Sequence, residues 1–118
     1  MGDPVAYFEI LGLDGPKLRE FYTSAFGWKT EPTMAAYWHV RTSPDRPVEG
    51  GVGSHAGIEA GHVTVYVEVE DLDESLARIE SLGGRIEQRP IDVPGGARIA
   101  LFLDPEGHLI GLQQARPS

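Results

Sequence analysis

The chain has 118 residues, with 18 acidic and 10 basic side chains, a formal net charge of −8 and no cysteine. Disulfide and thiolate chemistry are therefore excluded, and an acidic surface of this kind repels nucleic acid and anionic lipid. The polar start Met-Gly-Asp-Pro has no apolar signal-peptide core, and no apolar run reaches the length of a membrane span. We expect a cytoplasmic protein that binds neither nucleic acid nor a membrane.

The first half begins with a predicted strand and helix. Residues 5–11 alternate in polarity, which predicts a strand with Tyr7 and Glu9 on one face. Asp14-Gly15-Pro16 opens a helix and Gly27 ends it. The helical spacing predicts one buried stripe, made of Leu18, Phe21, Tyr22, Ala25 and Phe26.

Two more strands are predicted before the middle of the chain. In residues 35–42, Tyr37 and His39 share a face and Trp38 takes the other. A turn at residues 43–47 leads to the glycine-rich strand 48–54, and residues 56–61 are predicted to link the two halves. The glycines of that strand indicate close approach of backbone or ligand.

The second half repeats this order. Residues 62–69 alternate strictly, so His62, Thr64, Tyr66 and Glu68 share one face and four valines the other. Asp71 and Glu74 form a capping box for a helix that ends at Gly83-Gly84, with Leu72, Leu76, Ile79 and Leu82 as its apolar stripe. Three strands complete the half, at residues 85–89, 99–103 and 108–113; a loop at 90–96 precedes the second, and a turn at 104–107 joins the last two.

The two halves are copies of one pattern. Leu18 and Leu76 are 58 residues apart, and so are Phe21 and Ile79. The repeat predicts two tandem βαβββ units, at about residues 5–57 and 62–115, in a single domain spanning residues 1–118. One such unit cannot cover its own sheet, so we predict an α+β fold with a curved, mostly antiparallel sheet, both helices on its convex face and a concave cleft on the other.

Three segments carry a resemblance to a known family. They are Arg19–Trp28, Val69–Asp73 and Asp104–Gly107. Together with the Gly50-Gly51 pair they resemble the vicinal oxygen chelate superfamily, which includes glyoxalase I, bleomycin-resistance proteins and extradiol dioxygenases, and in particular its glyoxalase-like subgroup. The resemblance covers nearly the whole chain and implies this fold more specifically than any activity.

The resemblance also implies where a metal would bind. Metal-dependent members place ligands on the first and last strand of each unit, and these positions fall here on Tyr7, Gly50 or Gly51, Thr64 and Gly111. These are poor ligands or none at all. An alternative register puts His62 at the third position, but a catalytic zinc needs three protein ligands. We therefore predict no metal and no other cofactor, with a divalent metal as the alternative.

Strand parity predicts the residues that line the cleft. They are Tyr7, Glu9, either Trp38 or His39, His62, Thr64, Tyr66 and Gln113. Glu9 is the candidate general base, although a hydrogen bond to Tyr66 or His62 would make it only a shaping residue. Trp38 is either core or a stacking wall for an aromatic ligand.

These features favour a metal-free module that binds a small, partly aromatic or apolar molecule, as bleomycin-resistance relatives do. The alternatives are a glyoxalase-like lyase or a dioxygenase with an unrecognised metal site, an acid–base catalyst that uses Glu9, and a regulatory domain that senses a metabolite. We also expect a homodimer, because sheet edges are usually covered, the strand 48–54 has little side chain to protect its edge, and short relatives often pair.

Overall fold

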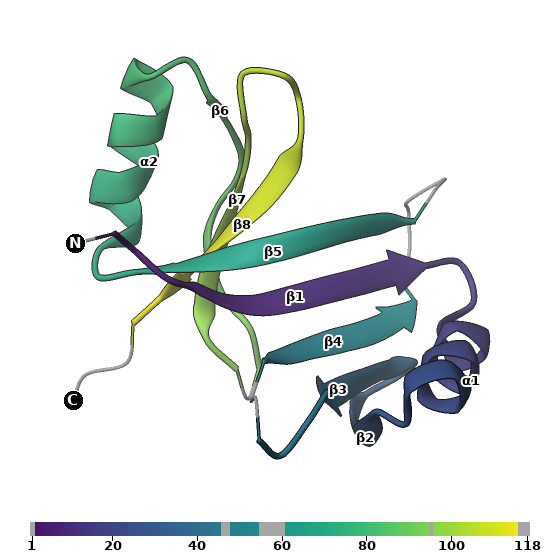
Figure 1. Cartoon of the computed structure of the whole chain (residues 1–118). Helices are drawn as coiled ribbons and strands as arrows, with labels where there is room; N and C mark the ends of the chain where they lie inside the picture. Colours follow the sequence, from purple (N-terminus) through teal and green to yellow (C-terminus); the bar gives the residue numbers. More distant parts are fainter. Residues whose placement is uncertain (1, 46–47, 55–60, 95, 116–118) are drawn as a thin grey trace. The chain divides into compact units, whose positions relative to one another are not determined.

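The structure, a computed structural model, describes residues 2–45, 48–54, 61–94 and 96–115. These residues form two helices and eight strands (Figure 1). In chain order the elements are β1 (Val5–Gly12), α1 (Gly15–Phe26), β2 (Lys29–Met34), β3 (Tyr37–Arg41), β4 (Glu49–Ser54), β5 (His62–Val69), α2 (Leu72–Ser81), β6 (Arg85–Asp92), β7 (Arg98–Leu103) and β8 (Leu109–Gln114).

The chain divides into two compact units. The amino-terminal unit is Tyr7–Thr64, and the carboxy-terminal unit is Met1–Ala6 with Val65–Ser118. Their strand orders are β2-β3-β4-β1 and β6-β7-β8-β5. Strand β1 pairs in parallel with β4, and β5 pairs in parallel with β8, while the other pairs within each unit are antiparallel. The predicted βαβββ repeat and the α+β class are confirmed. The shared cleft and the joining of the units into one domain stay predictions.

Helix α1 has the predicted ends but not the predicted burial. The Asp14 carboxylate accepts a hydrogen bond from the Lys17 N–H at 3.0 Å, and Gly27 ends the helix at φ 70°. The predicted buried stripe is wrong, because Phe21, Ala25 and Phe26 are exposed, the two rings at 61 % and 62 %, and Leu18 and Tyr22 are only half-buried. The start of the helix lies close to β4, where the N–H of buried Gly15 donates to Ser54 Oγ at 2.6 Å.

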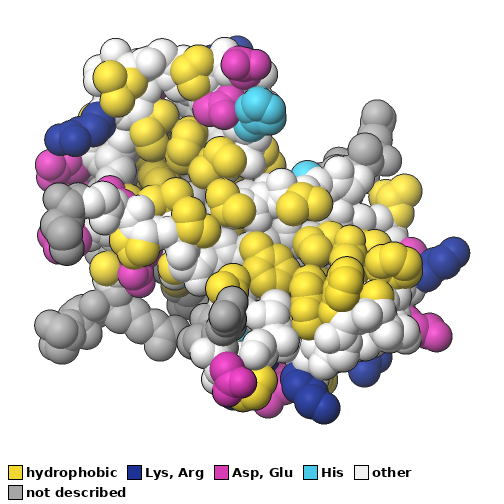
Figure 2. All heavy atoms as spheres, viewed as in Figure 1, with side chains coloured by type: hydrophobic (Ala, Val, Ile, Leu, Met, Phe, Trp, Pro, Cys, Tyr) yellow, Lys and Arg dark blue, Asp and Glu magenta, His cyan; other side chains and the backbone are white. Residues whose placement is uncertain are grey.

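The aromatic residues of α1 contact one another and Trp28. The Tyr22 and Trp28 rings stack with centroids 5.4 Å apart, Phe26 lies 5.4 Å from Trp28, and Phe21 meets Tyr22 edge-on. Phe8 joins from β1, 5.6 Å from Trp28. We call these five residues the aromatic group. Figure 2 shows a broad hydrophobic area on the side of the molecule that carries β1, β4 and α1.

Helix α2 covers the core of its own unit. Asp71 caps it by accepting from the Glu74 N–H at 3.0 Å. The buried core consists of Val69, Leu72, Leu76, Ala100 and Leu112, and Ile79 packs against it. The fourth member of the predicted stripe is wrong: Leu82 is 73 % exposed, because it lies at the end of the helix just before Gly83, whose φ of 102° turns the chain away.

The sequence missed or shortened the two outermost strands. Strand β2 was not predicted, and β6 extends through Asp92 where a loop was expected from residue 90. Each contains a proline, Pro32 or Pro90, which an outermost strand tolerates because one side of its backbone is not needed for pairing. The prediction that strand 48–54 has an unprotected edge is also wrong, since β4 pairs with β3 on one side and with β1 on the other.

Parts of two predictions fall outside the described residues. These are residues 46–47 of the predicted turn and residues 56–60 of the predicted linker. Within the described part of the chain, neither helix has the length and apolar character needed to cross a bilayer.

Candidate functional site

Polar side chains from β1 and β3 gather on one face of the amino-terminal unit, on either side of Gly51 in β4. In the sheet register Glu9 lies beside Gly51, and Gly51 beside His39, so all three positions share that face. Tyr7 precedes Glu9 by two residues, and Tyr37 precedes His39 by two, so both belong to the same face. We call Tyr7, Glu9 and Tyr37 the polar cluster.

The polar cluster is a chain of hydrogen bonds. The Tyr37 hydroxyl donates to Glu9 Oε2 at 2.8 Å, and the Tyr7 and Tyr37 hydroxyl oxygens are 2.8 Å apart. His62 Nε2 lies 4.0 Å from Glu9 Oε1, and the Glu9 side chain is 13 % exposed. Tyr37 is thus a hydrogen-bond partner of the Glu9 carboxylate. The sequence analysis placed Tyr37 on the same face as His39 but did not include it in the site.

Glycines in β4 make room for the Tyr37 ring. A Cβ atom at Gly51 would overlap the Tyr37 hydroxyl and come within 2.6 Å of the Tyr7 hydroxyl, and one at Gly53 would come within 2.8 Å of the Tyr37 ring. The close approach predicted for this strand is therefore that of a side chain of the protein itself. The aromatic ring lies over backbone that carries no side chain.

Trp38 and His39 lie on opposite faces of β3, and His39 shares the face of Tyr7 and Glu9. The His39 ring centroid lies 6.3 Å from that of Tyr7, and His39 Nε2 lies 2.8 Å from Glu49 Oε1. Trp38 faces the other way, with the Arg19 guanidinium of α1 5.3 Å from its ring centroid. Strand alternation thus turns Trp38 toward α1, and which of the two residues lines the predicted cleft stays a prediction.

The remaining predicted residues are less accessible. Thr64 of the amino-terminal unit is 2 % exposed, and Tyr66 of the carboxy-terminal unit is 6 % exposed and lies against Gly111. Gln113 is half-buried beside Glu68 in the β5–β8 pair. Tyr66 and Gln113 lie in the other unit, so the expectation that all these residues line one cleft stays a prediction.

Both hydroxyls of the cluster resist ionisation. Burial raises the pKa of Tyr7, and burial together with the negative charge of Glu9 raises the pKa of Tyr37 well above its ordinary value of 10.0. The phenols therefore stay neutral at physiological pH and act as hydrogen-bonding groups.

This pKa shift predicts a loss of stability in alkali. Above pH 10 the unfolded chain releases phenol protons that the folded chain keeps, so the free energy of unfolding should fall as pH rises. The slope is about 1.4 kcal/mol per pH unit for each such proton. Urea unfolding between pH 8 and pH 11.5 measures it. A double variant, Tyr7→Phe with Tyr37→Phe, should show a shallower decline, and an unchanged slope would contradict this explanation.

The donor set of the cluster does not suit a catalytic metal. Within the described residues no group of three or more His, Asp or Glu side chains could hold an ion. Glu9 and His62 give one carboxylate and one imidazole, and the Glu9 carboxylate already accepts from Tyr37. Three protein ligands are the usual minimum for a catalytic zinc. The described residues of the polar cluster therefore do not provide the ligands of the metal that the resemblance implies.

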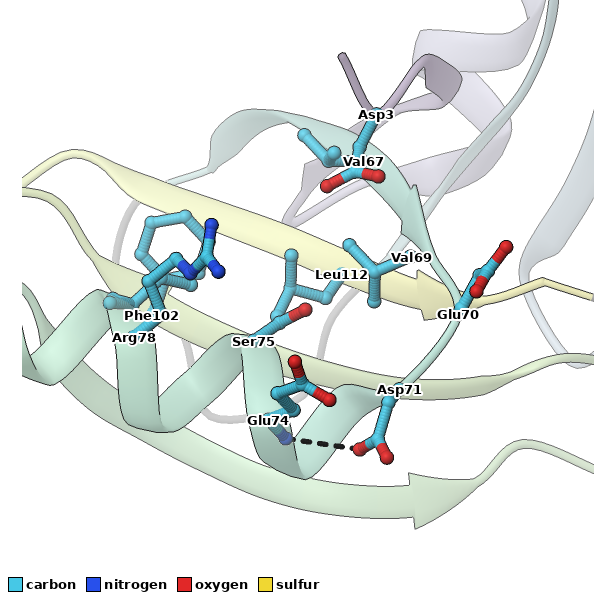
Figure 3. Close-up of a pocket in the computed structure, with 11 residues that line it drawn as sticks. Asp3, Val67, Val69, Glu70, Asp71, Glu74, Ser75, Arg78, Phe102 and Leu112 are labelled. Atoms are coloured by element: carbon cyan, nitrogen blue, oxygen red, sulfur yellow. Dashed lines mark hydrogen bonds between the residues drawn. The ribbon is translucent and has the colours of Figure 1, made fainter. Parts of the chain in front are cut away.

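A hollow lies in the carboxy-terminal unit, between α2 and the valine face of β5 (Figure 3). Its volume is about 650 Å³, with Val67, Val69 and Leu112 on one side and Glu74 and Arg78 of α2 on the other. Val67 and Val69 thus face α2, as strand parity predicts. The sequence analysis did not predict this cavity, because a gap between a helix and a sheet depends on side-chain packing.

Comparison with known proteins identifies the class. The family model described as the Glyoxalase/Bleomycin resistance protein/Dioxygenase superfamily matches residues 5–112. The chain therefore belongs to this superfamily.

Particular relatives add detail. The chain is 31 % identical over 121 residues to the anthracycline biosynthesis protein DnrV of Streptomyces peucetius; the match covers 86 % of this chain and 43 % of DnrV, so the chain spans less than half of that relative's length. The fold is similar to that of a Mn(II)-bound glyoxalase from Novosphingobium aromaticivorans, with a TM-score of 0.68, 16 % identity and coverage of 93 % and 38 % of the two chains. It is also similar to methylmalonyl-CoA epimerase from Mycobacterium tuberculosis, with a TM-score of 0.66, 18 % identity and coverage of 96 % and 88 %.

Proposed function

We propose that this chain binds a small, partly aromatic molecule at the polar cluster and does so without a metal ion. The observation that carries the proposal is the hydrogen-bonded chain of Tyr7, Tyr37 and Glu9 above Gly51. It offers two aromatic rings and a fixed set of polar atoms, which is the composition typical of small-molecule sites. The relative named for anthracycline biosynthesis supports an aromatic ligand.

The Glu9 carboxylate supports binding more than catalysis. Because it accepts a hydrogen bond from Tyr37, its lone pairs are partly engaged and its position is fixed. Glu9 would then orient Tyr37 and shape the site. Sequestration of a harmful compound is the biological use that such a site allows.

The experiment combines metal analysis with a binding screen. Protein purified without a histidine tag should contain well under one equivalent of Zn, Ni, Mn or Fe. Small aromatic compounds should bind equally well with and without EDTA, and Glu9→Ala should weaken that binding about tenfold or more. Glu87→Ala, an exposed carboxylate on β6, is the matched control that should leave it unchanged.

The alternative function is that of a glyoxalase-like lyase or a dioxygenase, which a bound metal together with turnover would support. Glu9 is the candidate base in that case, because it is 13 % exposed and His62 lies 4.0 Å away. A full metal equivalent that disappears in His62→Ala, together with turnover only in the metal-loaded protein, would overturn metal-free binding.

We also propose that the chain forms a homodimer through the aromatic group. Phe21 and Phe26 expose most of their rings, and aromatic residues are enriched in protein interfaces. Charge supports this choice of surface. The amino-terminal unit has 5 basic and 7 acidic residues, against 5 and 11 in the carboxy-terminal unit, so two copies repel each other less through the former.

A further inference from the structure

The hollow between α2 and β5 is a candidate binding site distinct from the polar cluster. Its volume of about 650 Å³ is in the range of small-molecule sites. Its described lining residues all belong to the carboxy-terminal unit, so this unit is enough to form it. We propose that the hollow binds a small organic cation with an apolar body, such as an arylalkyl amine. The inference goes beyond the proposed function and does not depend on it.

The floor of the hollow is apolar. Val67 of β5, Ile79 of α2 and Phe102 of β7 line it. These three side chains pack against the buried core of their unit but are themselves only partly buried. Part of their apolar surface is therefore in contact with water, and the apolar body of a ligand would cover it favourably.

The rim of the hollow is acidic. Exposed carboxylates of Asp3, Glu70, Asp71 and Glu74 line it, against one basic side chain, Arg78, among the described lining residues. The Asp71 carboxylate caps α2. The carboxylates of the other three form no ion pair with any residue that the structure describes. A ligand cation would therefore be attracted to this rim without displacing a cation of the protein.

The acidic residues come from separate parts of the sequence. The Glu68 N–H donates to the Pro4 carbonyl at 2.8 Å, which holds the start of the chain against β5 and brings Asp3 to the hollow. Glu70 directly follows β5. Negative charge at the start of a helix also stabilises the helix itself, which accounts for Asp71 but not for Asp3.

Arg78 lies toward the opposite end of the hollow. It follows Asp71 by two helical turns, which is about 10 Å along the axis of α2. Figure 3 shows Arg78 and Phe102 away from Glu70 and Asp71. The acidic end is therefore not neutralised by Arg78, and the ligand cation is expected there.

Three probes of one shape test the selectivity for charge. Naphthylethylamine is a cation at neutral pH, naphthylethanol is neutral and naphthylpropionate is an anion. Dissociation constants from ligand-observed NMR on the full chain should show the amine binding about fivefold tighter than the alcohol, and the anion weakest. Because the rim is exposed, the preference for the amine should fall as NaCl is raised from about 20 mM to about 500 mM.

Two pairs of substitutions locate the charge effect. Asp3→Asn with Glu70→Gln should reduce the preference for the amine over the alcohol to about twofold or less. Asp73→Asn with Glu80→Gln is the matched control, because it removes two carboxylates from exposed positions of α2 that do not line the hollow. The control should keep the wild-type preference.

A third variant locates the apolar body of the ligand. Val67→Phe fills part of the hollow and should weaken the binding of all three probes. In the wild-type chain, the methyl signals of Val67 and Ile79 should shift when the amine is added. Circular dichroism verifies that each variant is folded.

Several outcomes would overturn the proposal. These are equal affinities for the amine and the alcohol, no binding of any probe, or a fivefold preference that survives in Asp3→Asn with Glu70→Gln. Amine binding that is lost in Glu9→Ala but kept in Val67→Phe would assign the amine to the polar cluster instead. Dissociation of a dimer into monomers by the amine, measured by light scattering, would show that a second copy of the chain covers the hollow.

Discussion

Replacing Gly51 by Ala is expected to lower the free energy of unfolding by roughly 3 kcal/mol, as for other overpacked positions. The new Cβ would overlap the Tyr37 hydroxyl and crowd the hydroxyl of Tyr7, so the Tyr37 ring must move. The same movement should break the hydrogen bond to Glu9 and abolish ligand binding. Urea unfolding monitored by circular dichroism measures the stability change.

A second substitution tests whether the Tyr37 ring causes the loss of stability in Gly51→Ala. In a Tyr37→Ala background the main obstacle is gone, so Gly51→Ala should then cost roughly 1 kcal/mol or less. Gly2→Ala, where a Cβ would meet nothing within 4 Å, should leave the stability of the wild-type chain unchanged. Equal costs of Gly51→Ala in both backgrounds would show that the space over Gly51 is not set by Tyr37.

Replacing both Phe21 and Phe26 by Ser should convert a dimer into a monomer. Each ring exposes on the order of 100 Å², which is worth roughly 2 kcal/mol when buried, and a twofold dimer would lose four rings. Light scattering at micromolar concentration should give twice the 12.8 kDa chain mass for the wild type and 12.8 kDa for the variant.

The matched control for the dimer is Leu82→Ser. Leu82 is 73 % exposed at the end of α2, in the other unit, and its loss should leave the dimer intact. A wild-type mass of one chain at every concentration, or a double variant that remains dimeric, would show that the aromatic group is not the interface.

Local patterns in the sequence predicted most of the fold, because strand faces and helix ends are determined by residues close together in the chain. Strand alternation placed Tyr7 and Glu9 on one face, and Asp14, Asp71, Gly27 and Gly83 marked the helix ends that the structure has. Strand β2 was missed because Lys29-Thr30-Glu31-Pro32 has neither apolar alternation nor β-favouring composition. Pairing with β3 holds it in the sheet instead.

The candidate site was only partly predictable, because it depends on contacts between strands. Strand parity placed Tyr37 and His39 together, yet nothing local to β3 shows that the Tyr37 ring extends across Gly53 and Gly51 to reach Glu9. The glycines of β4 carried the missing signal, since repeated glycine in a strand indicates that a bulky group lies above it. Burial of α1 was overpredicted because periodicity identifies an apolar stripe but not the surface that covers it.

The central claim is that the polar cluster holds a small molecule without a metal, and carbon-13 NMR of the four tyrosines tests it most directly. The protein is labelled at its tyrosine rings, its signals are assigned through Tyr→Phe variants, and phenol is added in the presence of EDTA. We predict that the signals of Tyr7 and Tyr37 shift and saturate together while that of Tyr22 stays in place. Shifts confined to Tyr22, or shifts of Tyr7 and Tyr37 that appear only after a divalent metal is added, would contradict the claim.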